Sequence, residues 1–319
     1  ARLAPRAGEH QFNGGIYRDV QLIVTEFCGI EEYGVFVQTT KLERENEELN
    51  VWNATVKIET QVFEQRSRIE EPLFLETCIC DGETVLAKEI SRINMKTEGE
   101  IDSEKKDRNS TSSLNSKTIT QQISLSGIQP WSPNSPKLYT VVSRVSYNGI
   151  LVDCVRTNFG IRTVRFDKGN GFFLNGEHFA ILGANVHQDH AGWGDAVTRA
   201  GIQRDIRMIK ECGMNTIRGS HYPHHPYFAQ VCDEEGILFW SEMCFWGTGG
   251  DKRDGFWVAS AYPPKKEDQK DFEKSCLDQL EEMIRSQRSH PSIICWSMCN
   301  EVFFTDAPVK DKAKELIRK

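Results

Sequence analysis

HPSIICWSMCNE, at residues 290–301, has the pattern of a buried strand that ends on an amide and a carboxylate. Residues 292–299 carry no charge, and Asn300 and Glu301 follow where this apolar run stops. A short run of this kind is typical of a strand that is buried on both faces, as the strands of a parallel sheet are. The stretch therefore predicts a buried strand whose carboxyl end holds an ionisable side chain.

Strands and helices alternate upstream of this stretch, from about residue 170 onward. Helical spacing of Ile202, Ile206 and Ile209, with Gly213 as a stop signal, separates the first two predicted strands. The other predicted elements are, in chain order, strand 178–187, strand 214–223, helix 226–236, strand 237–242, helix 265–289, strand 290–301 and the start of a helix at 306–319. Repeated β/α units of this size predict a parallel sheet, either doubly wound or a (β/α) barrel.

Each predicted strand of this half ends in polar or ionisable residues. They are Asn185 and His187; Arg218, Ser220 and His221; Glu242; and Asn300 and Glu301. A (β/α)₈ barrel gathers its active site at the carboxyl ends of several strands in this way. Because four strands cannot close such a barrel, the sheet is either open or the first half of a barrel.

The preceding part, residues 20–166, has a different pattern, in which short runs alternate apolar and polar residues. Examples are VQLIVTEF at 20–27, LFLETCIC at 73–80 and YTVVSRVSY at 139–147. Short, regularly spaced strands separated by turn residues predict an antiparallel β-sandwich. Residues 99–117 have almost no apolar content and predict a solvated loop.

The composition of the 319 residues suits a soluble protein with a sizeable core, because 39% are hydrophobic and 27% are charged. The formal net charge of −7, with no basic block, argues against nucleic acid as a partner. No apolar run approaches the ~20 residues of a membrane span, so no membrane partner is expected.

Ten cysteines are numerous for a chain of this kind. Cys28, Cys212, Cys232, Cys295 and Cys299 lie in apolar periodic segments, where a free thiol packs as a small hydrophobe. Buried free thiols are therefore the preferred interpretation over a disulfide framework. They favour a reducing compartment, and so the cytoplasm over the periplasm or secretion.

Glu301 is the first candidate for chemistry. A carboxyl group at the end of an apolar strand is expected to be partly desolvated, which raises its pKa and suits a general acid. Asn300 beside it offers a hydrogen bond to a substrate hydroxyl without titrating. The alternative without function is that Glu301 pairs with a lysine or arginine, or caps the next helix.

The other candidates at the strand ends have simple alternatives. Arg218 is able to fix a carboxylate by a two-pronged hydrogen bond, or to form an ordinary surface ion pair. Trp240 and Trp246 flank Glu242, and an exposed tryptophan offers a stacking surface for a sugar ring, whereas a buried one is core. Two histidine groups invite a metal interpretation, although hydrogen-bonding wall residues are the commoner case: His187, Asp189 and His190, and His221, His224 and His225.

The opening stretch resembles the acid/base signature of glycoside hydrolase family 2, the family of β-galactosidases, β-glucuronidases and β-mannosidases. NGGIYRDV at 13–20 is similar to the end of the family's N-terminal sugar-binding domain. PWSPNSPKLYTV at 130–141 and FGIRTVRF at 159–166 are similar to its immunoglobulin-like second domain. FLNGEHFAILGANVHQDH at 173–190, residues 215–242 and the opening stretch are similar to its first four barrel strands.

The resemblance implies a role for each candidate. Glu301 would be the general acid/base, and Asn300 would bind the hydroxyl next to the anomeric carbon. His187 and His221 would line the sugar subsite, Arg218 would orient the nucleophile, and Trp246 would contact substrate. The stretch HQDHAGWGDAVT at 187–198 is more similar to β-galactosidases than to β-glucuronidases.

Two departures from the family pattern affect the chemistry. Trp246 and Thr248 stand where some β-galactosidases place the glutamate and histidine of a magnesium site, so we expect neither that metal site nor any other cofactor. The family's nucleophile lies on a later barrel strand, beyond Lys319, and Glu242 matches a different position. A retaining glycosidase needs both carboxylates, so we expect the 319 residues by themselves to be inactive.

The sequence thus predicts a multidomain internal fragment of a retaining exo-β-glycosidase, with β-galactosidase preferred over β-glucuronidase or β-mannosidase. The expected domains are the end of a jelly-roll domain at 1–19, an immunoglobulin-like β-sandwich at 20–166, and the first half of a (β/α)₈ TIM barrel at 167–319. A carbohydrate is the expected partner, and a homo-oligomer of the intact enzyme stays open. The rivals are a metal-dependent barrel hydrolase using His187, Asp189 and His221, and a non-catalytic carbohydrate-binding protein.

Overall fold

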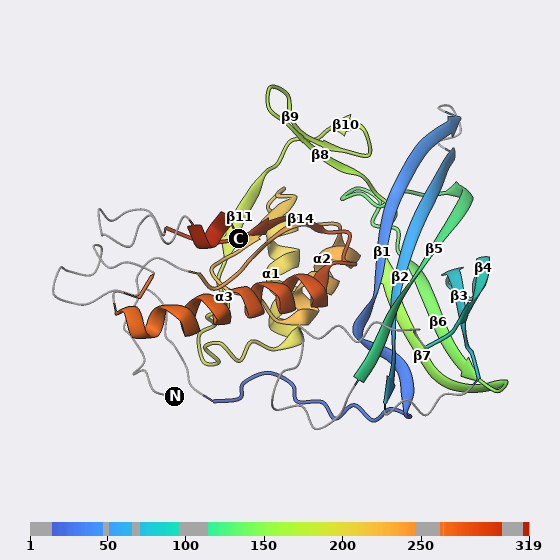
Figure 1. Ribbon diagram of the computed structural model, residues 1–319. Helices are drawn as coiled ribbons and strands as arrows, with labels where there is room; N and C mark the ends of the chain where they lie inside the picture. Colours follow the sequence, from blue (N-terminus) through green and yellow to red (C-terminus); the bar gives the residue numbers. More distant parts are fainter. Residues whose placement is uncertain are drawn as a thin grey trace. The chain divides into compact units, whose positions relative to one another are not determined.

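The computed structural model describes residues 15–46, 51–65, 71–95, 114–245, 262–263, 265–301 and 315–318. The chain divides into two compact units (Figure 1). The sandwich unit comprises Gln21–Phe179 and Arg288–Pro291, and the parallel-sheet unit comprises Ala1–Val20, Ala180–Gln287 and Ser292–Lys319. Within the described ranges, no helix is long and apolar enough to cross a membrane.

Two antiparallel sheets form most of the sandwich unit, in the orders β1-β2-β5 and β4-β3-β6-β7. Their strands are β1 (Cys28–Asn46), β2 (Val51–Gln65), β3 (Leu73–Asp81), β4 (Thr84–Ile93), β5 (Leu114–Ile128), β6 (Tyr139–Tyr147) and β7 (Ile150–Phe159). A third, small sheet of order β10-β9-β8 follows, made by β8 (Val164–Asp167), β9 (Gly171–Leu174) and β10 (Glu177–His178). The unit is therefore all β, as the short alternating runs predict.

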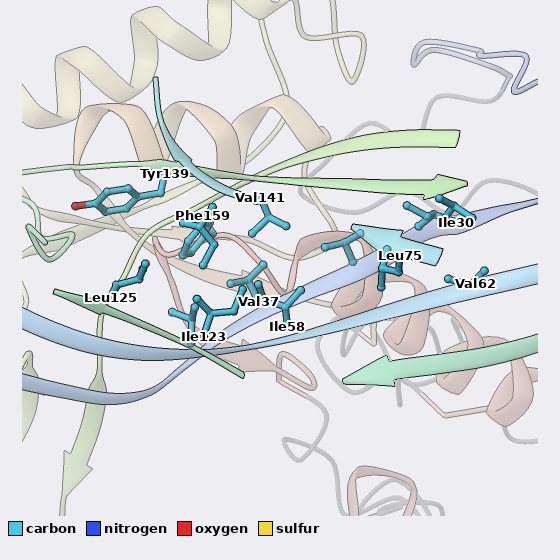
Figure 2. Packing of buried hydrophobic residues seen from close by; sticks show 14 of the residues in the cluster. Ile30, Val37, Ile58, Val62, Leu75, Ile123, Leu125, Tyr139, Val141 and Phe159 are labelled. Carbon is cyan, nitrogen blue, oxygen red and sulfur yellow. The ribbon is translucent and has the colours of Figure 1, made fainter. Parts of the chain in front are cut away.

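The two large sheets share one hydrophobic core, because each turns its apolar side chains toward the other. Buried and half-buried residues alternate along most of β2, which is the period of a strand with one inward face. Ile58 of β2, Leu75 of β3 and Val141 of β6 are all fully buried in the same cluster (Figure 2). Each such side chain contributes about 1.5–3 kcal/mol to folding, so this packing is what joins the sheets.

Two predicted boundaries of this unit are wrong. Residues 20–27 are not a strand, since β1 begins only at Cys28, and the apolar side chains of Val20, Leu22 and Val24 are exposed. Alternation alone does not make a strand where no neighbouring strand accepts its hydrogen bonds. In addition, β5 begins at Leu114, inside the stretch expected to be a loop, because pairing with β2 extends it.

Gly160, just after β7, is predicted to be intolerant of any side chain. A Cβ atom there would lie 2.7 Å from Cβ and Cγ of Pro291 and 2.8 Å from Cβ of the fully buried Trp131. We expect Gly160→Ala to lower the free energy of unfolding by about 1–3 kcal/mol through overpacking, measured by denaturant titration. The control is Gly169→Ala, whose Cβ would meet only Asp167 Oδ1 at 3.9 Å. Equal stability of the two variants would contradict the prediction.

The parallel-sheet unit contains one four-stranded sheet of order β11-β12-β13-β14 (Figure 1). The strands are β11 (Gly183–Val186), β12 (Thr216–Gly219), β13 (Leu238–Glu242) and β14 (Ile293–Ser297), and the helices are α1 (Arg199–Glu211), α2 (Pro226–Glu235) and α3 (Lys266–Gln287). All three strand pairs are parallel, as the sequence predicts. The strand order follows the chain without the reversal that marks a doubly wound sheet.

Local sequence explains where the first two helices start and what they bury. The Thr198 side chain accepts a hydrogen bond from the Gly201 N–H and so caps α1. His225 caps α2 in the same way, and Pro226 occupies its first turn. Ile206 of α1, Phe228 of α2 and Ile217 of β12 belong to one buried cluster, so both helices pack on the sheet.

All ten cysteines lie in the described residues and are free thiols. Cys28 and Cys232 are fully buried, as their apolar surroundings predict. Cys212 is exposed, so the prediction that it packs as a hydrophobe is wrong. It follows α1 directly at the helix C-cap, where the chain leaves the core.

Candidate active site

The carboxyl ends of the four parallel strands bring most of the predicted site residues to one edge of the sheet. Register places Asn185 of β11 beside Arg218 of β12, and Arg218 beside Trp240 of β13. The last residue of β13, Glu242, lies beside Ser297 at the end of β14. Residues that are far apart in the chain therefore converge because parallel strands end together.

Glu242 is the centre of this edge. Its side chain is fully buried, and Arg218 holds it with two nitrogens: Nε lies 3.1 Å from Oε2, and Nη2 lies 3.0 Å from Oε1 and 2.8 Å from Oε2. His221 Nδ1 lies 2.7 Å from Oε1, and the Ser297 hydroxyl donates to Oε2 at 2.7 Å. The two-pronged carboxylate contact predicted for Arg218 is thus made within the protein.

This hydrogen bonding keeps Glu242 ionised. Burial by itself raises the pKa of the carboxyl group, but the hydrogen bonds from His221, Ser297 and Arg218 outweigh burial and lower it below the ordinary value of 4.5. An ionised carboxylate only accepts hydrogen bonds, so His221 Nδ1 carries the proton in this contact. Glu242 is consequently a fixed anion that orients its neighbours.

Asn300 is oriented by the same guanidinium. Arg218 Nη2 donates to Asn300 Oδ1 at 2.7 Å, which identifies the other amide atom as nitrogen. That Nδ2 group is buried and has no hydrogen-bond partner among the described residues. The backbone N–H of Asn300 donates to the Phe245 carbonyl at 3.0 Å. Asn300 therefore carries a fixed, buried amide donor that no described residue satisfies.

Two of the predicted histidines meet at the same edge. The ring centroids of His187, after β11, and His221, after β12, lie 5.1 Å apart in an edge-to-face arrangement. His221 is fixed by Glu242, so the pair is connected to the buried anion. The peptide bond between Ser220 and His221 is cis.

Glu301 follows Asn300 directly, but its surroundings differ from the prediction. Its side chain is exposed, so the expectation that strand packing desolvates it is wrong. The physical reason is that β14 is the edge strand of the sheet, and among the described residues no further strand covers its end. The φ angle of Glu301 is 53°, in the left-handed region that non-glycine residues rarely adopt. Such outliers cluster at functional sites.

The other residues of the metal interpretation are dispersed. His190 pairs with Asp205 at 2.5 Å, and Asp189 is exposed. Within the described ranges, no group of three or more His, Cys, Asp and Glu side chains could hold a metal ion. The metal-dependent rival therefore has no ligand cluster in this part of the chain. Trp246, predicted to contact substrate, and Thr248 lie outside the described residues.

His224 is a core residue rather than a site residue. It is 2% exposed, its Nε2 lies 3.1 Å from the Ser220 carbonyl oxygen, and its ring packs on Phe228 and Phe239. Gly219 makes this packing possible, because a Cβ there would lie 2.6 Å from the Phe239 ring and 3.2 Å from that of His224. Burial lowers the pKa of His224 to about 4, and the hydrogen bond to Ser220 opposes this only in part.

His224 should make stability depend on pH. The unfolded imidazole takes up a proton near pH 6.5 and the folded one only near pH 4. The free energy of unfolding should therefore fall as the pH drops between these values, by at most about 3 kcal/mol from this group. In His224→Gln, which keeps a donor but does not titrate, this part of the slope should disappear. Denaturant titrations across this pH range would measure it, and an unchanged slope would contradict the assignment.

Two features of this site were not predicted from the sequence: the contribution of Ser297 and the role of Glu242. Ser297 lies in the middle of an apolar stretch and has no motif of its own. Glu242 was recognised as a strand-end acid, but its role as the common acceptor of three donors was not. Its signal was available in principle, because an acid on one strand end with arginine on the preceding one is a natural ion pair.

Two models of one protein family match the chain. The family model described as "Glycosyl hydrolases family 2, TIM barrel domain" matches residues 164–318, and a second, described as "Glycosyl hydrolases family 2", matches residues 75–162.

Curated relatives and solved structures carry related names. A "Beta-glucuronidase" from Bacteroides fragilis is 29% identical over 303 residues, which cover 94% of this chain and 39% of that protein. "Beta-galactosidase BgaC" from Bifidobacterium adolescentis is 32% identical over 197 residues, 60% of this chain and 18% of that protein. The structure of a Bacteroides uniformis β-glucuronidase superposes with a TM-score of 0.75 at 25% identity, covering 98% of this chain and 35% of that one.

The chain thus spans well under half the length of these relatives, but the two family matches together cover most of its own length. The first match, over residues 164–318, contains the parallel sheet, the paired histidines and the buried Glu242 cluster. The chain belongs to glycoside hydrolase family 2.

Proposed function

We propose that the chain carries the general acid/base part of a retaining exo-β-glycosidase that acts on terminal β-galactosides by double displacement. Glu301 protonates the leaving oxygen and then deprotonates the water that releases the sugar. Asn300 binds the hydroxyl next to the anomeric carbon, and His187 and His221 line the sugar subsite. Arg218 orients the nucleophile, and Trp246 contacts the substrate.

One observation supports this proposal above the others. Arg218, His221 and Asn300 converge on the buried Glu242, and Asn300 presents an unsatisfied amide donor one residue before Glu301. A preorganised donor beside an exposed carboxyl group is the arrangement that protonation of a bound glycosidic oxygen requires. A carbohydrate-binding protein without catalysis would not need the acid.

The architecture that we propose follows the family. Residues 20–166 form the immunoglobulin-like β-sandwich, residues 167–319 the first half of a (β/α)₈ barrel, and residues 1–19 the end of a jelly-roll domain. The mechanism needs a second carboxylate as nucleophile, which we propose is supplied by a later barrel strand of the full-length protein. The substrate is a carbohydrate.

A neutral sugar suits the described site better than a uronic acid. The guanidinium of Arg218 lies at the ends of these strands, and Glu242 already neutralises it in a two-pronged pair. A glucuronide carboxylate would therefore compete with a buried anion for the same charge. β-Glucuronidase activity is the second candidate, because a relative from Bacteroides fragilis carries that name. In that case, residues outside the described ranges would bind the glucuronate carboxylate.

The test is a substrate panel on the full-length protein. We expect hydrolysis of p-nitrophenyl β-galactoside with the highest kcat/KM, above the β-glucuronide and the β-mannoside, and the first sugar product should retain the β configuration by NMR. Chelation with EDTA should leave the rate unchanged, which separates this proposal from the metal-dependent rival. Inversion of configuration would contradict the mechanism, and sugar binding without turnover would favour the binding protein.

A further inference from the structure

The segment before the sandwich contacts the loops that carry the paired histidines. Arg18 belongs to the same compact unit as the parallel sheet. Its Nη2 group donates to Gln188 Oε1 at 2.9 Å and to the Pro223 carbonyl at 2.7 Å. One nitrogen therefore joins the loop after β11 to the loop after β12.

Gln188 is the second part of this connection. It is 3% exposed, and its Oε1 also accepts the backbone N–H of His225 at 3.2 Å. Its own backbone N–H donates to the Tyr222 hydroxyl at 3.0 Å. The backbone N–H and the side-chain oxygen of Gln188 are therefore both hydrogen-bonded to residues 222–225. Arg18 is the second donor to that side-chain oxygen.

These contacts lie next to the paired histidines. His187 precedes Gln188, and His221 precedes Tyr222, so each histidine is the chain neighbour of a residue in this hydrogen-bonded connection. The 5.1 Å separation of the two rings therefore depends on how the two loops are held together. Glu242 also anchors His221, and Gln188 ties the loop of His187 to residues 222–225.

Arg18 is half-buried, and the part of its guanidinium that is buried makes a specific contact rather than a surface one. Its Nε atom is buried and has no hydrogen-bond partner among the described residues. Leaving a buried N–H group unsatisfied is costly, so the position of the side chain is set by the two acceptors that its Nη2 group joins. Beside it, Asp19 pairs with Arg199 at 3.1 Å, but these side chains are 59% and 63% exposed, and an exposed pair of this kind is weak.

We propose that Arg18 is a positioning residue of the sugar site, which acts through Gln188 to fix His187 against His221. This inference rests on the proposed function, because it assigns the two histidines to substrate binding. Arg18 itself touches no substrate in this proposal. Removing its donors frees the loop of His187 and weakens binding of the sugar.

The experiment uses the full-length protein and p-nitrophenyl β-galactoside. Arg18→Met keeps an apolar stem but loses the donors, and we expect kcat/KM to fall at least tenfold, mainly through a higher KM, with the unfolding midpoint little changed. Arg18→Lys should restore part of the loss. The matched control is Asp19→Asn, which breaks the neighbouring exposed pair and should stay within twofold of the wild type.

A double variant tests the route through Gln188. If Arg18 acts through that side chain, Arg18→Met combined with Gln188→Met should lose little more than Gln188→Met alone. Full additivity of the two losses would overturn the route, and an Arg18→Met protein within twofold of the wild type would overturn the inference. If Arg18→Met does not fold, Gln188→Met and Arg18→Lys decide the same question.

Hydrogen exchange separates failure of this inference from failure of the proposed function. In Arg18→Met, peptides covering residues 187–190 and 220–225 should exchange faster, whereas Asp19→Asn should leave them unchanged. A wild-type protein that hydrolyses no aryl β-glycoside would refute the proposed function, and exchange would still test Arg18. Unchanged exchange in Arg18→Met would overturn the positioning role.

Discussion

Glu301→Gln in the full-length protein is expected to lower kcat/KM for an aryl β-galactoside with a poor leaving group by about 10²–10⁴-fold. The glutamine keeps the shape of the side chain but has no proton to donate to the leaving oxygen. A substrate whose leaving group needs no protonation, such as a dinitrophenyl glycoside, should form the glycosyl-enzyme almost as fast as in the wild type. Initial rates on a series of aryl glycosides with different leaving-group pKa values would measure this contrast.

The second half of the reaction provides an independent check on Glu301. Breakdown of the glycosyl-enzyme needs a base to activate water, so it should become limiting in the variant. Azide needs no base, and its addition should restore turnover and yield a glycosyl azide. Glu267→Gln, an exposed carboxylate in the first turn of α3, is the control and should have wild-type rates. Equal loss on all leaving groups, without azide rescue, would mean that Glu301 is not the acid/base.

The convergence of the site was predictable from the sequence because it depends only on topology. Arg218 lies near the end of β12, Glu242 ends β13 and Asn300 follows β14, and parallel strands end at one edge. The α1 and α2 helices were predictable from local sequence, namely from apolar spacing and a stop signal. Where periodicity is strong and the chemistry is at a strand end, sequence pattern and fold agree.

The features that depend on contacts between strands were not predictable. VQLIVTEF alternates like a strand, yet the strand begins after it, since alternation records side-chain faces and not the presence of a pairing partner. Desolvation of Glu301 depends on what covers the end of β14, which the sequence of β14 does not contain. The Ser297 hydroxyl as a donor to Glu242 was equally hidden, because it lies inside an apolar stretch 55 residues away along the chain.

Glu242→Gln is expected to lower the free energy of unfolding of the parallel-sheet unit by about 3 kcal/mol. The substitution removes the counter-charge of Arg218 and turns an amide donor toward groups that themselves donate. The carboxylate is fully buried, while the Arg218 side chain retains 27% exposure, so the cost should lie at the lower end of that for a broken buried pair. Denaturant titration at neutral pH would measure the loss.

Glu235→Gln is the matched control for this variant. Glu235 also accepts from two cations, Arg207 and Lys210, but those side chains are 59% and 45% exposed. Exposed pairs contribute about 0–1 kcal/mol, so its loss should be much the smaller of the two. The same substitution in one unit thus isolates the effect of burial. Equal losses in both variants would show that Glu242 is not a buried structural anion.

A double-mutant cycle distinguishes the net contribution of the pair from the cost of breaking it. Arg218→Met alone leaves Glu242 buried without its guanidinium, so it should destabilise by a similar amount. When both charges are removed together, neither is left uncompensated, and the double variant should be more stable than the sum of the single losses implies. Activity should not recover with stability, because Asn300 loses the donor that fixes its amide in every variant lacking Arg218. Recovery of both properties together would mean that this cluster serves only the fold.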